Sequence, residues 1–152
     1  MHISAKSDYA LRALIVMAQS DADAPLRAEA MASAQDIPQN FLLAILADLR
    51  RASIVRSKRG HGGGWHLAKD AGTISVADVI RAVDGPLVSV HGVRPESVSY
   101  QDAATVLQPV WIAARSSLRE VLESVSLSDL ASGTLPPQVQ LRTADEDAWE
   151  PR

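Results

Sequence analysis

Four segments of the first 85 residues are predicted to be helical, three from hydrophobic residues at helical spacing and residues 26–35 from their alanine content. The segments cover residues 7–20 (with Ser7 as the expected N-cap), 26–35, 38–51 and 73–85. In residues 38–51 the apolar positions form a single stripe that should face the core: Phe41, Leu42, Ile45, Leu46 and Leu49. The remaining positions of that helix are then left on the outside.

Between the third and fourth helical segments the pattern changes to that of a β-hairpin. Residues 53–60 begin with the strand formers Ile54 and Val55, and residues 63–70 place Trp65 and Leu67 two apart on one face. Two short helices joined by a three-residue turn form a helix-turn-helix, and the hairpin adds a wing to it. From the helices alone, an ordinary helical hairpin is the alternative. We therefore expect residues 1–85 to be a winged helix-turn-helix DNA-binding domain, mainly α with a small β-hairpin (an α+β fold).

The second half of the chain divides into three parts. Residues 86–104 are poor in helical pattern and are expected to be a loop of the kind that senses a signal. Residues 105–132 predict one long helix, and its seam residues alternate at spacings of four and three: Leu107, Trp111, Ala114, Leu118, Val121 and Val125. A helix of this length exceeds what one small domain can cover, so a homodimer interface is expected; packing on its own domain is the alternative. Residues 133–152 form a tail that is either disordered or one short helix.

Composition and charge narrow the function classes. The chain has 152 residues, 47% of them hydrophobic, and no cysteine, which excludes disulfides, thiolate metal sites and a cysteine nucleophile. No apolar run is long enough to span a membrane, and a cytoplasmic protein is expected. The net charge is −3, yet residues 50–59, RRASIVRSKR, carry five cations and no acid. A local basic strip of this kind suits a protein that binds DNA with one face.

One motif raises the possibility of an enzyme. GHGGGW, residues 60–65, resembles the glycine-rich oxyanion loop of lipase-like esterases. That chemistry also requires a G-x-S-x-G nucleophile elbow and a larger sheet, and the sequence contains no such elbow. The glycines are therefore interpreted as the tip of the wing, and no enzymatic activity is expected.

The exposed positions of residues 38–51 and of the wing are the candidate DNA contacts. Gln39 and Asn40 are expected to meet adenine edges or, as an alternative, phosphates only, while Leu43 is suited to a thymine methyl group. Arg59 should enter a minor groove. The remaining candidates should neutralise phosphates or, as an alternative, form a solvated charged face: Arg50, Arg51, Arg56, Lys58 and His61, with Lys6 and Arg27 adding contacts from helix starts.

The order of these elements resembles a known family. MHISAKSDYALRAL, IPQNFLLAILADLRRA, VRSKRGHGGGWHLAKD and ISVADVIRAVDGP are similar to segments of the Rrf-two family of bacterial winged-helix repressors, the group of IscR, NsrR and CymR. The resemblance covers about residues 1–130. It implies a homodimeric regulator of double-stranded DNA, with a recognition helix at residues 38–51, a wing arginine at Arg59 and a long C-terminal dimerisation helix.

The sequence departs from the family where many members hold an iron–sulfur cluster. Those members use three cysteines in the loop that matches residues 86–104, which here has none, and Asp8 stands where some members have an acidic ligand. No cofactor and no metal are therefore expected. His91 and Arg94 in this loop are candidates for binding a small anionic effector, and a partner protein is an alternative regulator.

Two further departures lie in the DNA-binding domain. Ser53 stands where the family usually has glycine, and Leu43 and Ala44 replace polar base-reading side chains, so the operator sequence is open. The alternative function for the whole chain is a winged-helix module that binds a partner protein and little DNA.

Overall fold

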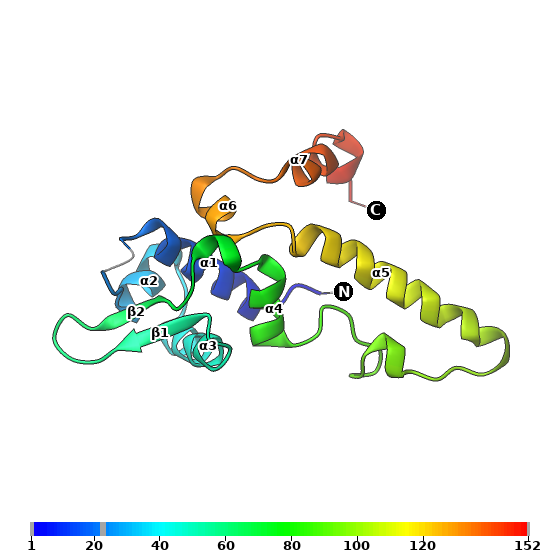
Figure 1. Cartoon of the computed structure of the whole chain (residues 1–152), viewed down its shortest axis with the longest axis horizontal. Coiled ribbons are helices and arrows are strands. Elements are labelled where there is room, and N and C mark those ends of the chain that lie inside the picture. The colour runs from blue at the N-terminus through cyan, green and yellow to red at the C-terminus, as the bar shows by residue number, and fades with distance from the viewer. Residues whose placement is uncertain (1, 22–23, 152) are drawn as a thin grey trace.

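The computed structural model describes residues 2–21 and 24–151. Helices dominate it, and a single two-stranded antiparallel sheet is present in the described ranges (Figure 1). The elements are α1 (Ala5–Gln19), α2 (Ala28–Gln35), α3 (Gln39–Arg51), β1 (Val55–Lys58), β2 (Gly64–Leu67), α4 (Val76–Asp84), α5 (Leu107–Leu122), α6 (Leu127–Ser132) and α7 (Pro137–Thr143). Short 3₁₀ turns lie at Ala71–Thr73, Pro95–Ser97, Asp102–Val106 and Glu146–Trp149. The fold is that of a winged helix-turn-helix, as the sequence predicts.

The core forms where α1, α2, α3 and α4 meet behind the hairpin. Leu14, Met31 and Leu46 are fully buried in it, together with Leu42, Ile45 and Leu49 of the α3 stripe. Phe41 is an exception to the predicted stripe, because 46% of it is exposed. Its ring instead forms a T-shaped pair with Tyr9 on α1, with ring centroids 5.9 Å apart.

Capping residues set the helix starts. The N-cap of α1 lies three residues earlier than the sequence pattern predicts, because Ser4 rather than Ser7 caps the helix and accepts a hydrogen bond from the Ser7 amide at 3.0 Å. Ser7 is buried, and its hydroxyl donates to the Asp84 carboxylate at the end of α4. Ser75 and Asp78 form a capping box at the start of α4. The bond from Ser7 to Asp84 thus joins the start of α1 to the end of α4.

The hairpin is shorter than its sequence pattern, and its strands pair from Val55–Leu67 to Lys58–Gly64. Backbone packing explains two of the glycines. A Cβ on Gly63 would lie 2.3 Å from the Lys58 carbonyl oxygen, and one on Gly64 would lie 2.5 Å from that of Leu26. Leu26 and Trp65 exchange backbone hydrogen bonds of 2.8 and 2.7 Å, so the residues before α2 anchor the base of the wing.

The predicted helix over residues 105–132 is two helices, α5 and α6. Ser126 starts α6 with a capping box to Asp129, and the Val125 carbonyl accepts from the Val76 amide at 2.9 Å. Val125 and Leu127 are thereby buried against α4 and α1, at 5% and 0% exposure. The helix ends because burying these two side chains in the winged-helix domain requires an extended backbone between them. Val125 is therefore a core residue, and its assignment to the seam of an interface is wrong.

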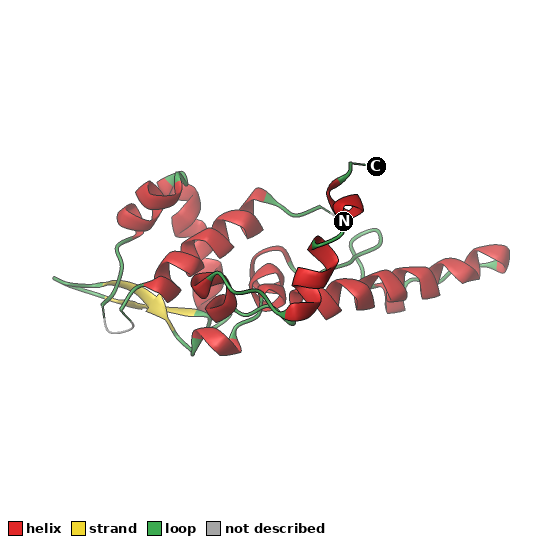
Figure 2. Cartoon of the chain, turned by 90° about the horizontal axis from the view of Figure 1, so that it is seen from above, coloured by secondary structure: helices red, strands yellow, loops and turns green. Residues whose placement is uncertain are grey.

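α5 extends away from the domain at the end opposite the hairpin, as both views show (Figures 1 and 2). The tail contains α7 and a 3₁₀ turn, which agrees with the short-helix alternative. Among the described residues, no helix has the length and apolar character needed to cross a bilayer.

Candidate nucleic-acid interface

The buried stripe of α3 decides which of its residues face solvent. Because Leu42, Ile45 and Leu49 point into the core, the opposite face, with Gln39, Asn40 and Leu43, is exposed at the N-terminal half of the helix. The Gln39 amide donates to the Glu29 carboxylate on α2 at 3.0 Å. The sequence therefore predicted the exposed face of α3 correctly, apart from Phe41.

Leu43 lies next to the wing. It is 41% exposed and shares a shallow hollow of about 250 Å³ with Arg27 and with Gly60 and Trp65 of the hairpin. The apolar side chain of Leu43, the cation of Arg27 and the glycine backbone at Gly60 thus lie together at the junction of α2, α3 and the wing.

Two arginines end α3 close to the hairpin. The guanidinium of Arg50 stacks over the Trp65 ring, 6.0 Å from its centroid, which is a cation–π contact between α3 and β2. Arg51 is mostly exposed, with 77% of its side chain accessible, and pairs with Asp48. Arg50 therefore also helps hold the wing, while Arg51 remains available to a phosphate.

The wing carries its cations on the surface. Arg56 and Lys58 on β1, and Arg59 and His61 at the tip, are all exposed. The hairpin projects beyond the body of the domain in both views (Figures 1 and 2), and α3 lies beside its base in Figure 1. A partner with negative charge can therefore meet α3 and the wing at the same time.

His66 lies on β2 beside two of the wing cations. His66 pairs with Arg56 across the two strands. Partial burial is the largest cause that lowers its pKa, and the positive charges of Arg56 and Lys58 lower it further. The wing is thus electropositive despite the negative net charge of the chain.

One expected contact is structural. Lys6 forms an ion pair of 2.5 Å with Asp48 of α3 and donates to the Val83 carbonyl of α4 at 2.6 Å. It joins α1, α3 and α4, so the interpretation of Lys6 as a DNA contact is not supported. The same pair lowers the pKa of Asp48, chiefly through the hydrogen bond from Lys6.

α5 has an unusual surface for a 16-residue helix, since none of its residues is buried. Leu107 is 39% exposed, Ala114 is exposed, and Trp111, Leu118 and Val121 are half-buried. Val110 and Ile112, which the seam pattern did not include, are 53% and 38% exposed. The Trp111 indole donates to the Tyr100 hydroxyl at 3.0 Å, so the loop before α5 orients this ring.

The two loop candidates do not converge. His91 is exposed at a turn with φ of 52°, while Arg94 lines a pocket with arginines of α4 and α5 that His91 does not reach. Arg81, Arg115 and Arg119 of this pocket were missed by the sequence analysis. The spacing of Arg115 and Arg119, four apart on one helix face, was the available signal.

The residues present do not fit an iron–sulfur cluster. The chain has no cysteine, and no cluster of three or more His, Asp or Glu residues suited to a metal occurs among residues 2–21 and 24–151. Asp8 pairs with Arg12 at 3.2 Å, in the first turns of α1. Asp8 is thus part of an ordinary helix-surface ion pair.

The helix-turn-helix, its wing and the exposed basic residues define a winged-helix DNA-binding protein. Comparison with known proteins specifies the family: residues 3–133 match the model of the Rrf2 family, described as iron-dependent transcriptional regulators. The chain belongs to this family, and it is a DNA-binding transcriptional regulator rather than an enzyme.

Its relatives are regulators of the same kind. Rv1287 of Mycobacterium tuberculosis, which is named as an HTH-type transcriptional regulator, is 42% identical to this chain over 150 residues. The match covers 99% of this chain and 93% of Rv1287. The structure is similar to that of CymR, the global cysteine regulator of Bacillus subtilis, with a TM-score of 0.74 at 30% identity, covering 88% of this chain and 98% of CymR. The structure is also similar to that of IscR of T. potens, with a TM-score of 0.69 at 28% identity. That match covers 100% of this chain and 93% of the IscR chain. The resemblance noted in the sequence is confirmed.

Proposed function

We propose that the protein is a repressor that binds a palindromic operator as a homodimer, without an iron–sulfur cluster. The observation that carries this proposal is the exposure of the α3 face and of the wing cations at one end of the domain. In a dimer, two copies of α3 enter successive major grooves about 34 Å apart. A bound dimer on a promoter excludes polymerase, which is the basis for expecting repression. Such a protein acts on the chromosome, in the cytoplasm.

The contacts divide into those that read sequence and those that supply affinity. Gln39 and Asn40, which are exposed at the start of α3, would bond adenine edges, and Leu43 would touch a thymine methyl group. Arg59, which is exposed at the tip of the wing, would enter the adjacent minor groove. Phosphates are neutralised by the remaining members of the surface, which are Arg50, Arg51, Arg56, Lys58 and His61.

The exposed apolar residues of α5 support dimerisation. Leu107, Val110 and Ile112 lie on a helix that has no buried residue in its own chain. Apolar surface of this extent, on a helix extended from the body, is typical of an interface with a second subunit. Leu118 and Val121 continue the face of Leu107 and Val110 toward the domain.

The test is fluorescence anisotropy with the DNA duplex that lies upstream of the gene, across a series of salt concentrations. The wild-type protein should bind this duplex more tightly than a random one, and its affinity should fall steeply as salt rises. Arg59→Ala should lose about tenfold in affinity for the specific duplex. Arg142→Ala, which removes an exposed arginine on α7 that pairs with Glu120, is the matched control and should bind as wild type does.

Equal binding to specific and random duplexes, unchanged by Arg59→Ala, would contradict the proposal. It would instead favour a winged-helix module that recognises a partner protein, and affinity capture of that partner would be the next experiment.

A further inference from the structure

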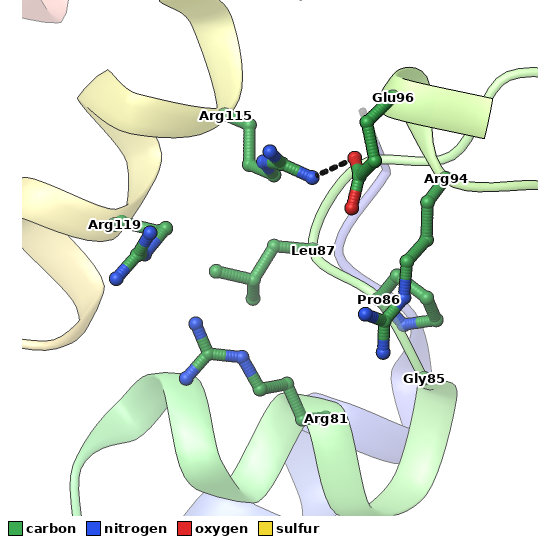
Figure 3. A pocket seen from close by; sticks show the side chains of 8 residues that line it. All are labelled: Arg81, Gly85, Pro86, Leu87, Arg94, Glu96, Arg115 and Arg119. Atoms are coloured by element: carbon green, nitrogen blue, oxygen red, sulfur yellow. Dashed lines mark hydrogen bonds and ion pairs between the residues drawn. The ribbon is translucent and has the colours of Figure 1, made fainter. Parts of the chain in front are cut away.

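A pocket of about 410 Å³ lies where α5 meets the winged-helix domain. Four arginines from three segments line it: Arg81 of α4, Arg94 of the loop, and Arg115 and Arg119 of α5 (Figure 3). The buried side chain of Leu87 lies between them and supplies an apolar surface. The pocket is at the opposite end of the domain from the wing, so it does not belong to the DNA-binding surface.

The carboxylates near these arginines neutralise them only in part. Arg115 pairs with Glu96, which is the acidic residue of the pocket wall. Arg119 bonds Glu123 at 2.9 Å, and Arg81 pairs with the same carboxylate. Asp78 lies 3.7 Å from Arg81 and is itself about half exposed. Positive charge therefore remains in excess.

Arg94 is the least neutralised of the four. It makes no ion pair within 4.0 Å with a carboxylate of the described residues. The pKa of Glu96 is lowered chiefly by a hydrogen bond from the backbone of Glu96 itself and by the bond from Arg115, and the charge of Arg94 lowers it further. Figure 3 shows Arg94 beside Pro86, across Leu87 from Arg81 and Arg119. Guanidinium groups therefore line two opposite sides of the pocket.

We propose that this pocket binds a small polyanion that carries two or more carboxylate or phosphate groups on a short carbon skeleton. Guanidinium groups bind carboxylates and phosphates through two parallel hydrogen bonds, and four of them suit a multiply charged ligand better than a single acid. The volume matches that of pockets for small metabolites, and Leu87 provides contact for the carbon atoms.

The position of Glu123 indicates how the ligand acts. Glu123 joins Arg81 of α4 to Arg119 of α5, so it fastens α5 to the winged-helix domain. A polyanion that binds both arginines displaces Glu123 and changes the angle between α5 and the domain. Resting on the proposed function, this motion alters the spacing of the two α3 helices in a dimer and hence the affinity for DNA.

Binding is tested first without DNA, by isothermal titration calorimetry at constant ionic strength. The probes are pyrophosphate, citrate and succinate, with acetate as the singly charged control. At least one polyanion should bind with one site per chain, and acetate should not. Arg94→Gln should weaken that binding about tenfold, and Arg142→Gln, which makes the same change of charge outside the pocket, should not alter it.

Glu123→Gln tests the competition in the opposite direction. Because it frees Arg81 and Arg119, this variant should bind the polyanion more tightly than the wild type does. An unchanged or weaker affinity would overturn the displacement of Glu123. The absence of binding by every probe up to about 10 mM, or equal weakening by Arg94→Gln and Arg142→Gln, would overturn the pocket itself.

The same variants separate the pocket from the proposed function. Sedimentation equilibrium should give the same subunit association for Arg94→Gln as for the wild type; a weakened dimer would assign the arginines to the subunit interface and overturn the ligand pocket. Anisotropy with DNA is then repeated with and without the polyanion. If the protein binds a polyanion but no DNA, the ligand pocket is supported and the proposed repressor function is overturned. If it binds DNA but no polyanion, the repressor function is supported and the ligand pocket is overturned.

Discussion

Replacing Val125 with alanine should destabilise the winged-helix domain rather than an interface. Val125 is 5% exposed and packs with Val76, Ile80 and Leu87. The substitution removes two methyl groups, each worth about 0.8 kcal/mol of burial, and leaves a cavity. We expect a loss of about 2–3 kcal/mol in the free energy of unfolding, a large share of the roughly 5–15 kcal/mol typical of a domain.

Val121→Ala is the matched control, since it makes the same change four residues earlier on the predicted seam. Val121 lies on α5 and is half-buried. If α5 is a dimer interface, its replacement should weaken subunit association and cost little within the chain. Urea unfolding of both variants is followed by circular dichroism at several protein concentrations, alongside sedimentation equilibrium.

The two variants should differ in how they depend on concentration. The stability lost by Val125→Ala should be the same at every concentration, and that lost by Val121→Ala should vanish once the wild-type protein is itself monomeric. A Val125→Ala defect that disappears on dilution would refute the reasoning, because it would place Val125 between subunits in one continuous helix.

Two further changes test the framework of the domain. Asp48→Asn should cost about 1–2 kcal/mol at neutral pH, because it removes the partner of Lys6 from a pair whose side chains are 15% and 31% exposed. Since pairing lowers the folded-state pKa of Asp48 below its ordinary value of 3.8, this stability is present above that pH and is lost as the pH falls through the folded-state pKa. Urea unfolding from pH 7 to pH 3 should therefore show the wild type and the variant converging in acid; a constant difference would count against the ion pair. Gly64→Ala should cost about 1–3 kcal/mol, because its Cβ would lie 2.5 Å from the Leu26 carbonyl oxygen, and amide exchange at Trp65 should become faster. Slow exchange as in the wild type would show that the wing adjusts without losing its anchor.

The candidate DNA surface was largely predictable because it depends on local patterns. The stripe of α3 fixes its exposed face, and Arg56, Lys58 and Arg59 follow from their place on a hairpin. Lys6 was mispredicted because its role depends on Asp48, 42 positions away in the chain. The arginine pocket was only partly visible, since Arg94 stands in a loop while Arg81 and Arg119 come from helices that meet only in the folded chain.

The sequence by itself determined the order of elements, the class of fold and the face of α3 that is exposed, because helical periodicity, strand alternation and glycine at the wing act over short distances. It also contained a signal for the start of α6, the Ser126–Asp129 capping box, which the regular spacing of apolar residues concealed. Only the tertiary structure decided that α5 ends before this capping box. Periodicity predicts that Val125 is buried, but it does not identify the residues against which Val125 packs. In the folded chain Val125 packs against α4, because the chain turns back onto that helix after α5.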